Sequence, residues 1–536
     1  MTSAAAIPSH GSLSGSSQRH RFLILIAHIM ALTVNLLPLL VVDIPAIVDY
    51  PNHLARMHIL SNLAGSPELQ SIYRIDWAPV PNLVMDLFVP PIAQLIGLEL
   101  AGKVFVAATL VSVASGTVLL HRVVHGYLSY WPLAIYLFLY NGVLTYGFLN
   151  YLLGIGLCLI LLAVWIAPRH RQARWRIPLI VIGTLALYFS HLLAFATFAL
   201  CISSFEFWCW YQDERRRASD LLRAGAITAL PFILPVISFV LFTPPPQSGP
   251  NIRYDLMTGK LAAMLTPANL IYQPADILLV AFAIILLCVG LWRRWFRFAP
   301  ALAFPTAAVA ASILLVPTWL YDNWGNDMRL SIPLVALLIA AMRLTCPLRH
   351  AAAIGTVALT LLVGRNANLA VDWVFHDSLY SEFRVAAATM PNQARVFMAM
   401  DREAATRPGT ERYFRRALYH LVTLAVLERA VFVPTLFTGK GRQILAVQPE
   451  FEKLDVPHSR PMSRARLVRL ADPKFDESEI DWSKDVYHHR RFIGWPRHYD
   501  YLLMLDFGKH TNPLPEILRP VSTGSYFTLY TIEHRG

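Results

Sequence analysis

The chain has 536 residues, of which 56% are hydrophobic and only 15% are charged. Soluble domains usually carry about 25% charged residues, so the composition excludes an ordinary soluble protein and indicates a polytopic α-helical membrane protein. The net charge of +12 does not indicate a nucleic-acid partner, because the excess arginines lie mostly in short loops between apolar runs, as in the cytoplasmic loops of membrane proteins.

The N-terminal region predicts a tail followed by an anchor. Residues 1–20 are rich in Ser, Ala and Gly and are expected to form a disordered cytoplasmic tail. The apolar run at 22–42 is predicted to be the first span. It is long for the core of a signal peptide and is followed by no clear small-residue cleavage site, so it is expected to stay attached.

The stretch directly after this span combines two acids and two bases. Asp43 and Asp49 lie six residues apart, and His53 and Arg56 follow. Prolines at 45 and 51 disfavour helical geometry at the residues before them, and a helical pattern starts at Asn52, the expected N-cap. A bland polar loop would need neither a histidine nor two acids, so these four residues are candidates for function.

The rest of the first outer loop, 43–102, contains a moderately apolar segment at 82–98. Its Asp86, Pro90 and Pro91 suit a helix lying at the membrane interface better than a span. If it does not cross, the arginine-rich loops at 122–125, 169–176, 213–217, 293–297 and 343–349 all fall on the N-terminal side. The positive-inside rule makes that side cytoplasmic.

We therefore predict about eleven spans, with the N-terminus inside and the C-terminus outside. Together they form a transmembrane module over residues 21–365, which includes the outer loop 43–102. The expected spans are 22–42, 103–121, 131–149, 151–167, 177–190, 192–211, 220–242, 276–292, 299–319, 330–345 and 351–365.

Residues 366–536 differ in composition, because charged residues and proline return. Strands are expected at 395–400, 430–434, 499–505 and 526–532, and a helix at 413–429. The alternation of strands and helices predicts a small α/β domain. By the predicted topology it lies on the extracytoplasmic side.

Further ionisable residues are expected at the same outer face. They are His191 between two spans, Arg253 and Lys260 in the loop at 243–275, and Asp322 and Arg329 before the tenth span. Polar groups at membrane depth are retained mainly where they line a pathway or a site. His191 and Arg329 have a structural alternative of equal weight, as a span-end residue and as an interfacial anchor.

One reaction fits an aspartate among cations at a lipid surface. The carboxylate can act as general base on an acceptor hydroxyl, while arginine and lysine hold the phosphate of a lipid-linked sugar donor. No nucleotide-binding fingerprint is present in the sequence. The predicted donor is a polyprenyl-phosphate sugar, whose isoprenoid tail would lie between spans.

The acidic stretch Asp49–Arg56 after the first span, the long outer loop, the basic inner loops and the outer C-terminal domain resemble the GT-C superfamily of integral-membrane glycosyltransferases. The resemblance implies an enzyme of the plasma (inner) membrane that serves the cell envelope. It implies Asp49 as the catalytic residue and Asp43 as a helper, with a glycan, lipid or protein acceptor. It leaves open whether a divalent cation, Mg²⁺ or Mn²⁺, joins the two aspartates.

Two other classes of function stay open from sequence alone. A transporter or flippase of lipid-linked saccharide would have a similar apolar content, but it would usually show repeated halves and no large outer domain. A non-catalytic subunit for envelope assembly is the other alternative. The acidic stretch favours the enzyme.

Overall fold

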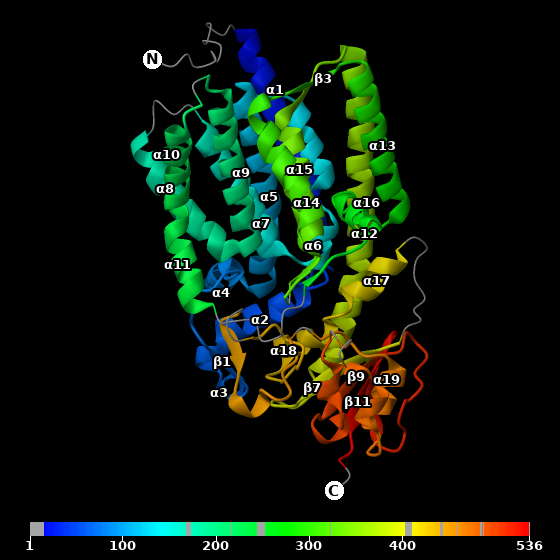
Figure 1. Ribbon diagram of the computed structural model, residues 1–536. Coiled ribbons are helices and arrows are strands. Elements are labelled where there is room, and N and C mark those ends of the chain that lie inside the picture. The colour runs from blue at the N-terminus through cyan, green and yellow to red at the C-terminus, as the bar shows by residue number, and fades with distance from the viewer. Residues whose placement is uncertain are drawn as a thin grey trace. The chain divides into compact units, whose positions relative to one another are not determined.

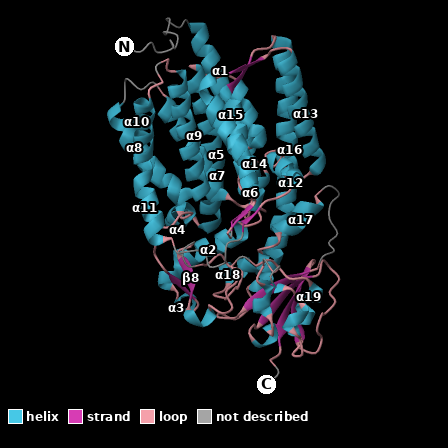
Figure 2. Cartoon of the chain, in the orientation of Figure 1, coloured by secondary structure: helices cyan, strands magenta, loops and turns pink. Residues whose placement is uncertain are grey.

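The computed structural model describes residues 15–167, 173–214, 216–243, 252–321, 323–401, 410–439, 443–457, 459–482, 485 and 487–534. The chain divides into two compact units. The first comprises Met1–Pro38, Val106–Leu241 and Pro245–Leu369, and the second comprises Leu39–Phe105, Phe242–Pro244 and Ala370–Gly536. The first is mainly helical, whereas the second contains the larger sheet (Figures 1 and 2).

Long apolar helices build the first unit, and seven helical stretches in the described residues are long and apolar enough to cross a membrane. The chain is therefore an integral membrane protein. These stretches are Gln18–Leu40, Leu98–His125, Leu149–Ile166, Leu192–Gln212, Ala218–Phe242, Gln273–Trp292 and Leu348–Ala387, with shorter apolar helices at Val84–Ile96, Trp175–Ser190 and Pro300–Leu315. The count of eleven spans and their orientation stay predictions.

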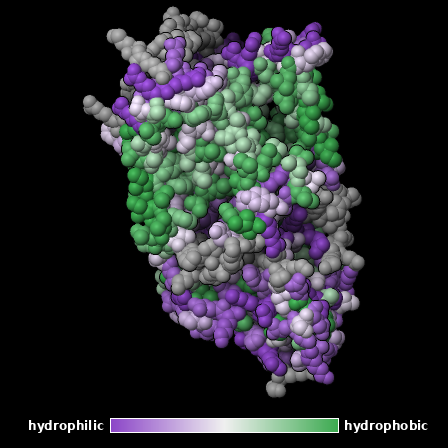
Figure 3. Space-filling model, viewed as in Figure 1, coloured by the Kyte–Doolittle hydropathy of each residue, from purple (hydrophilic) through white to green (hydrophobic). Residues whose placement is uncertain are grey.

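The helices that carry these stretches are α1 (Gly15–Leu40), α5 (Leu98–His125), α7 (Leu149–Ile166), α8 (Ala173–Ser190), α9 (Leu192–Gln212), α10 (Ala218–Ala229), α11 (Ile233–Phe242), α13 (Gln273–Trp292), α14 (Ala303–Leu315), α15 (Asn326–Ala341) and α16 (Leu348–Ala387). Helix α1 begins at Gly15, so residues 15–20 are helical and were wrongly included in the disordered tail; residues 1–14 lie outside the described residues. Hydrophobic side chains cover the visible face of the helical unit (Figure 3).

The predicted span at 131–149 is not one continuous helix. It consists of the 3-10 helix η2 (Trp131–Phe138) and the short helix α6 (Gly142–Tyr146). The side-chain oxygen of Asn141 accepts hydrogen bonds from the backbone N–H groups of Val143 and Leu144 and so starts a new helix. Gly147, with a φ of 101°, ends it in the left-handed conformation.

Close contact between α5 and α7 depends on two glycines. A Cβ atom at Gly156 would lie 2.5 Å from the backbone carbon of Ser112, and one at Gly116 would lie 2.7 Å from the carbonyl oxygen of Gly156. No side chain fits at either position without movement of the backbone. Small residues at this crossing allow the two helices to approach closely, as is common in membrane proteins.

Short strands connect helices at both ends of the first unit. Strands β2 (Ile252–Arg253), β4 (Trp319–Leu320) and β5 (Asn323–Trp324) form one antiparallel sheet, and β3 (Phe296–Phe298) pairs with β6 (Met342–Leu344). Helix α12 (Met257–Met264) lies in the loop before α13. Because α15 ends at Ala341, the predicted span at 330–345 runs four residues too far.

The first outer loop belongs to the second unit, together with residues 370–536. It forms α2 (Tyr50–Asn62), α3 (Pro67–Gln70), β1 (Tyr73–Ile75) and α4 (Val84–Ile96). Strand β1 pairs with β8 (Leu445–Val447), with Tyr73 opposite Val447. The sequence-based division grouped this loop with the transmembrane module, whereas its strand partner comes from the C-terminal region.

The C-terminal region is built on a four-stranded mixed sheet in the order β10-β11-β9-β7. Three predicted strands are confirmed as β7 (Val396–Met400), β9 (Tyr501–Leu505) and β11 (Phe527–Ile532). Strand β10 (Leu518–Thr523) was not predicted, because only its first residue is buried and Pro520 interrupts the pattern. Strands β7 and β9 are parallel, and the other pairs are antiparallel.

Two predictions for this region were wrong. Residues 430–434 form no strand, and only one bridge, between Arg395 and Phe432, extends the sheet there. The predicted helix at 413–429 is divided into α17 (Glu411–Ala417), the 3-10 helix η5 (Leu421–Leu424) and α18 (Ala425–Glu428). Helix α19 (Arg464–Ala471) also belongs to this region. The interruption after Leu418 brings His420 into the interior of the second unit, where it is 8% exposed.

Candidate functional site

Asp49 lies at the N-terminus of α2, and its side chain is not used to cap that helix. The carbonyl oxygen of Asp49 accepts a hydrogen bond from the backbone N–H of His53 at 3.0 Å, which starts the helix. The expected N-cap, Asn52, is instead inside α2. The Asp49 carboxylate, 20% exposed, is therefore directed to other partners.

The partner that the described residues place beside it is His420, whose Nε2 atom lies 3.3 Å from Oδ1 of Asp49. On the other side of the ring, Nδ2 of Asn52 lies 3.1 Å from Nδ1 of His420. The ring of Phe437 packs edge-on against His420, with ring centroids 5.2 Å apart. Asn52 and His420 are the residues of this cluster that sequence reasoning missed as functional candidates.

The side chain of Asn52 forms hydrogen bonds with the backbone of the loop at residues 435–438. This loop is itself anchored. Thr438 donates hydrogen bonds to both carboxylate oxygens of Asp455, at 2.8 and 2.9 Å. Loss of hydration raises the pKa of Asp455 to about 7, although the Thr438 hydrogen bond and the charge of Arg491 act in the opposite direction. Asp455 is thus tied to the same loop, 435–438, that contacts Asn52.

Asp43 occupies a different environment from Asp49. Its side chain is exposed, and its backbone N–H donates to Oδ2 of Asp377 at 2.9 Å. Oδ1 of Asp377 accepts from the backbone N–H of Ile44 at the same distance. The carboxylate that organises this turn is therefore Asp377, on α16, and the role of Asp43 as a helper stays a prediction.

His53 and Arg56 are enclosed within the second unit. The ring of His53 packs against Phe437, with centroids 5.3 Å apart. Arg56 is fully buried and forms an ion pair with Asp86 of α4 at 2.7 Å. In this arrangement Arg56 joins α2 to α4, and its guanidinium is not directed to a ligand.

In the first unit, Arg329 and His191 contact each other, with Nη1 of Arg329 3.1 Å from Nε2 of His191. Arg329 lies in the first turn of α15, and its guanidinium carbon is 3.8 Å from the ring centroid of Phe148, the residue before α7. His191 caps α9, so residues at the N-termini of three helices, α7, α9 and α15, lie together here. The partial positive charges of these N-termini favour an anion.

Both ring nitrogens of His191 face donors. Nδ1 accepts a hydrogen bond from the backbone N–H of Leu193 at 3.0 Å. Nε2 lies 3.1 Å from Nη1 of Arg329, which can only donate. His191 therefore helps to hold the guanidinium of Arg329 in place.

The remaining charged residues of the predicted site differ in whether other groups of the chain already bind them. Lys260 is buried and donates to Oδ2 of Asp327 at 2.8 Å and to the carbonyl oxygen of Val316. Thr318 donates to the same oxygen of Asp327. Arg253 is exposed on β2. Asp322 lies outside the described residues.

The Asp49 cluster brings together one carboxylate and one imidazole, from Asp49 and His420, while the Asp43 side chain is exposed. Within the described ranges, no group of three or more His, Cys, Asp or Glu side chains could hold a metal ion.

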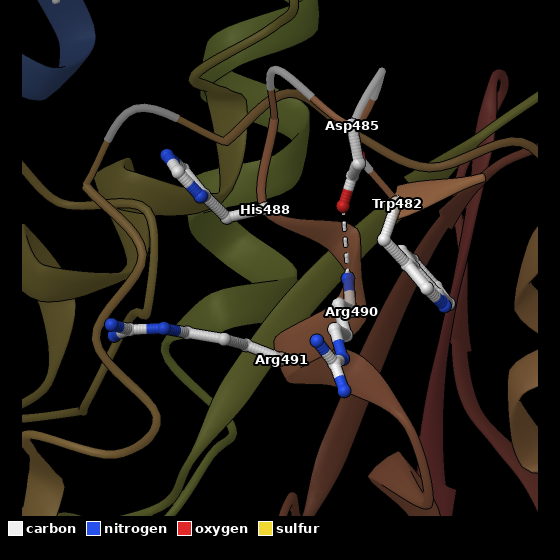
Figure 4. Close-up of a pocket in the computed structure, with 5 residues that line it drawn as sticks. All are labelled: Trp482, Asp485, His488, Arg490 and Arg491. Carbon is white, nitrogen blue, oxygen red and sulfur yellow. Dashed lines mark hydrogen bonds between the residues drawn. The ribbon is translucent and has the colours of Figure 1, made fainter. Parts of the chain in front are cut away.

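A separate pocket of about 360 Å³ lies in the C-terminal region and is lined by Trp482, Asp485, His488, Arg490 and Arg491. Figure 4 shows the side chains of His488 and Arg491 extending in one direction and Trp482 in another. Arg490 is paired with Glu477, and Arg491 donates to the carbonyl oxygen of Asp455. These cations are therefore engaged by the chain itself.

No family model matches the chain, and no curated protein matches it. Among solved structures, it is similar to the arabinofuranosyltransferase AftD from Mycobacteria, at 13% identity and a TM-score of 0.49, over 98% of this chain and 40% of that chain. It is also similar to ArnT from Cupriavidus metallidurans bound to undecaprenyl phosphate, at 11% identity and a TM-score of 0.46, over 95% of this chain and 98% of that chain.

The chain spans 40% of the length of the AftD chain that it matches. At these identities and TM-scores, neither similarity carries an argument about this chain's chemistry. The proposed chemistry therefore rests on this chain's own residues.

Proposed function

We propose that the protein is a membrane glycosyltransferase that moves a sugar from a polyprenyl-phosphate donor to an acceptor at the outer face of the membrane, with Asp49 as general base. One observation carries this proposal. The Asp49 carboxylate stands at a helix N-terminus without capping it, remains partly exposed and lies 3.3 Å from Nε2 of His420. Such a carboxylate can take a proton from a bound hydroxyl group.

The reaction balances without a further reactant. The acceptor oxygen forms a bond to the anomeric carbon of the sugar, and its proton passes to Asp49. The bond between that carbon and the donor phosphate oxygen breaks, and the electron pair leaves with the polyprenyl phosphate. Asp49 then releases the proton to water.

The donor phosphate is the role that we propose for Arg329 and His191. Arg329 presents nitrogen donors beside the N-termini of α7, α9 and α15, and His191 contacts its guanidinium. Charge-assisted hydrogen bonds from a guanidinium are well suited to phosphate. The acceptor, whether glycan, lipid or protein, is not specified by these residues.

The test compares two carboxamide variants of the full-length protein in membranes. The probe is a panel of radiolabelled pentoses and hexoses linked to undecaprenyl phosphate, with the cell membranes as the source of acceptor. Asp49→Asn should lower the transfer rate by about 10²- to 10⁴-fold, the usual contribution of a general base. Asp76→Asn, a change of the same size on an exposed side chain of the same unit, is the matched control and should keep more than a third of the rate. Equal rates in wild type and Asp49→Asn would exclude the general-base role.

A further inference from the structure

We propose that His420 positions the Asp49 carboxylate for proton transfer, and that Asn52 fixes the tautomer of His420 that this requires. The inference deepens the proposed function and rests on it, since it assigns a role to a residue that acts through Asp49. All three side chains belong to the second unit. Two come from the first outer loop and one from the C-terminal region.

The orientation of the Asn52 side chain is the first step. Its Oδ1 atom accepts a hydrogen bond from the backbone N–H of Phe437 at 2.7 Å, and its Nδ2 atom donates to the carbonyl oxygen of Thr435 at 2.8 Å. Exchange of the oxygen and nitrogen atoms would set donor against donor and acceptor against acceptor. The two backbone groups therefore fix the amide in one orientation.

The tautomer of His420 follows from this orientation. Because Nδ2 of Asn52 can only donate, Nδ1 of His420 accepts, and the proton of the neutral ring lies on Nε2. Asn52 is fully buried, and the ring of Phe437 packs against His420, so the imidazole has little freedom to turn.

Nε2 of His420 lies 3.3 Å from Oδ1 of Asp49. In the proposed arrangement the proton on Nε2 is directed to that oxygen, and Oδ2 is the oxygen that meets the acceptor hydroxyl. When Asp49 takes the proton from the acceptor on Oδ2, the contact with His420 persists. Partners of this kind align the reactive groups, and their loss commonly lowers the rate of the chemical step more than substrate binding.

Two amide variants separate this role from a structural one. The side-chain nitrogen of glutamine can reach the position of Nε2, whereas that of asparagine ends near the position of Nδ1. His420→Gln should therefore keep kcat within about 5-fold of wild type. His420→Asn should lower kcat by about 50- to 100-fold with KM for the undecaprenyl-phosphate sugar changed less than 3-fold. Equal kcat values for the two variants would overturn the proposal, whether both are active or both inactive.

A second measurement does not depend on activity. The ¹⁵N spectrum of the full-length protein labelled at histidine, in lipid nanodiscs, reports which ring nitrogen carries the proton. The His420 signals are identified by their loss in His420→Gln. We expect protonated Nε2 and unprotonated Nδ1 at neutral pH, and a proton on Nδ1 would overturn the inference. If wild type transfers no sugar while the tautomer is as expected, the proposed function fails, not the geometry of the cluster.

Discussion

Oδ1 of Asp86 accepts hydrogen bonds from both Nε and Nη2 of Arg56, at 2.9 and 2.7 Å, and neither side chain reaches solvent. Nη1 of Arg56 and Oδ2 of Asp86 are buried without a hydrogen-bond partner among the described residues. An enclosed pair of this kind holds α2 against α4 and so supports the helix that begins beside Asp49.

Removal of one member of this pair should destabilise the protein. Arg56→Met leaves the Asp86 carboxylate buried without its counter-charge, which typically costs about 3–5 kcal/mol. Denaturation of the purified protein in detergent measures the change. The double variant Arg56→Met, Asp86→Leu should recover at least half of the loss, because apolar pairs replace buried ion pairs well. Additive losses in the double variant would contradict this account.

Arg329 should affect donor binding. Arg329→Ala is expected to weaken binding of undecaprenyl phosphate by about 10- to 100-fold, since hydrogen bonds to charged groups contribute about 1.5–3 kcal/mol each. Arg329→Lys keeps the positive charge but lacks the planar pair of donors. Its affinity for undecaprenyl phosphate should therefore lie between those of wild type and Arg329→Ala. The control is Arg297→Ala, an exposed arginine of the same unit, with affinity near that of wild type. Unchanged affinity in folded Arg329→Ala would remove the residue from the phosphate site.

Asp455 should make stability depend on pH. Its pKa in the folded protein is about 7, above the ordinary value near 4, so the folded state binds the proton more tightly than the unfolded state. The stabilisation is fully present below about pH 4 and is lost as the pH rises to about 7. In Asp455→Asn, which still accepts from Thr438, the melting temperature should fall less over this range. A parallel decline in both proteins would disprove the assignment.

The crossing of α5 and α7 should not tolerate a methyl group. In Gly156→Ala the Cβ atom would lie 2.2 Å from Oγ of Ser112, so the helices must separate. The expected loss is about 1–3 kcal/mol, as for other overpacked sites. Gly355→Ala on α16 is the matched control, since no heavy atom lies within 4 Å of its Cβ position. It should be neutral or slightly stabilising, and thermal unfolding in detergent compares the two.

The predicted orientation can be tested by labelling. Ser478 is exposed in the C-terminal region, and Arg217 is exposed in a predicted cytoplasmic loop. With the native cysteines replaced, Ser478→Cys should react with a membrane-impermeant maleimide in intact cells, while Arg217→Cys should react only after lysis. The reverse pattern would invert the topology.

Sequence patterns identified the elements that consist of continuous apolar residues. The runs around α7, α9 and α13 and the buried strands β7, β9 and β11 were found because they are apolar over the length of a span or a strand. The interruption at Asn141 was missed, since its cause is a side chain capping its own backbone within an otherwise apolar run.

The site was predicted only in part for a different reason. Asp49 could be singled out because an acid beside a membrane span is unusual. By contrast, nothing near Arg56 or Lys260 in the sequence indicates that Asp86 and Asp327 bind them. His420 lies within residues 413–429, whose sequence predicts an ordinary helix. Its partnership with Asp49 arises from tertiary packing, which no local pattern encodes.

The first outer loop and the C-terminal region belong to one compact unit, and this has a consequence for biosynthesis. Asn52 and His420 are separated by 368 residues. At elongation rates of about 5–20 residues per second, roughly 20 to 70 seconds pass between their emergence from the ribosome. Throughout that interval the nascent chain carries Asp49 without its histidine. Under the proposed function, the acid and its positioning residue would therefore meet only after all the apolar helices up to α16 have been synthesised.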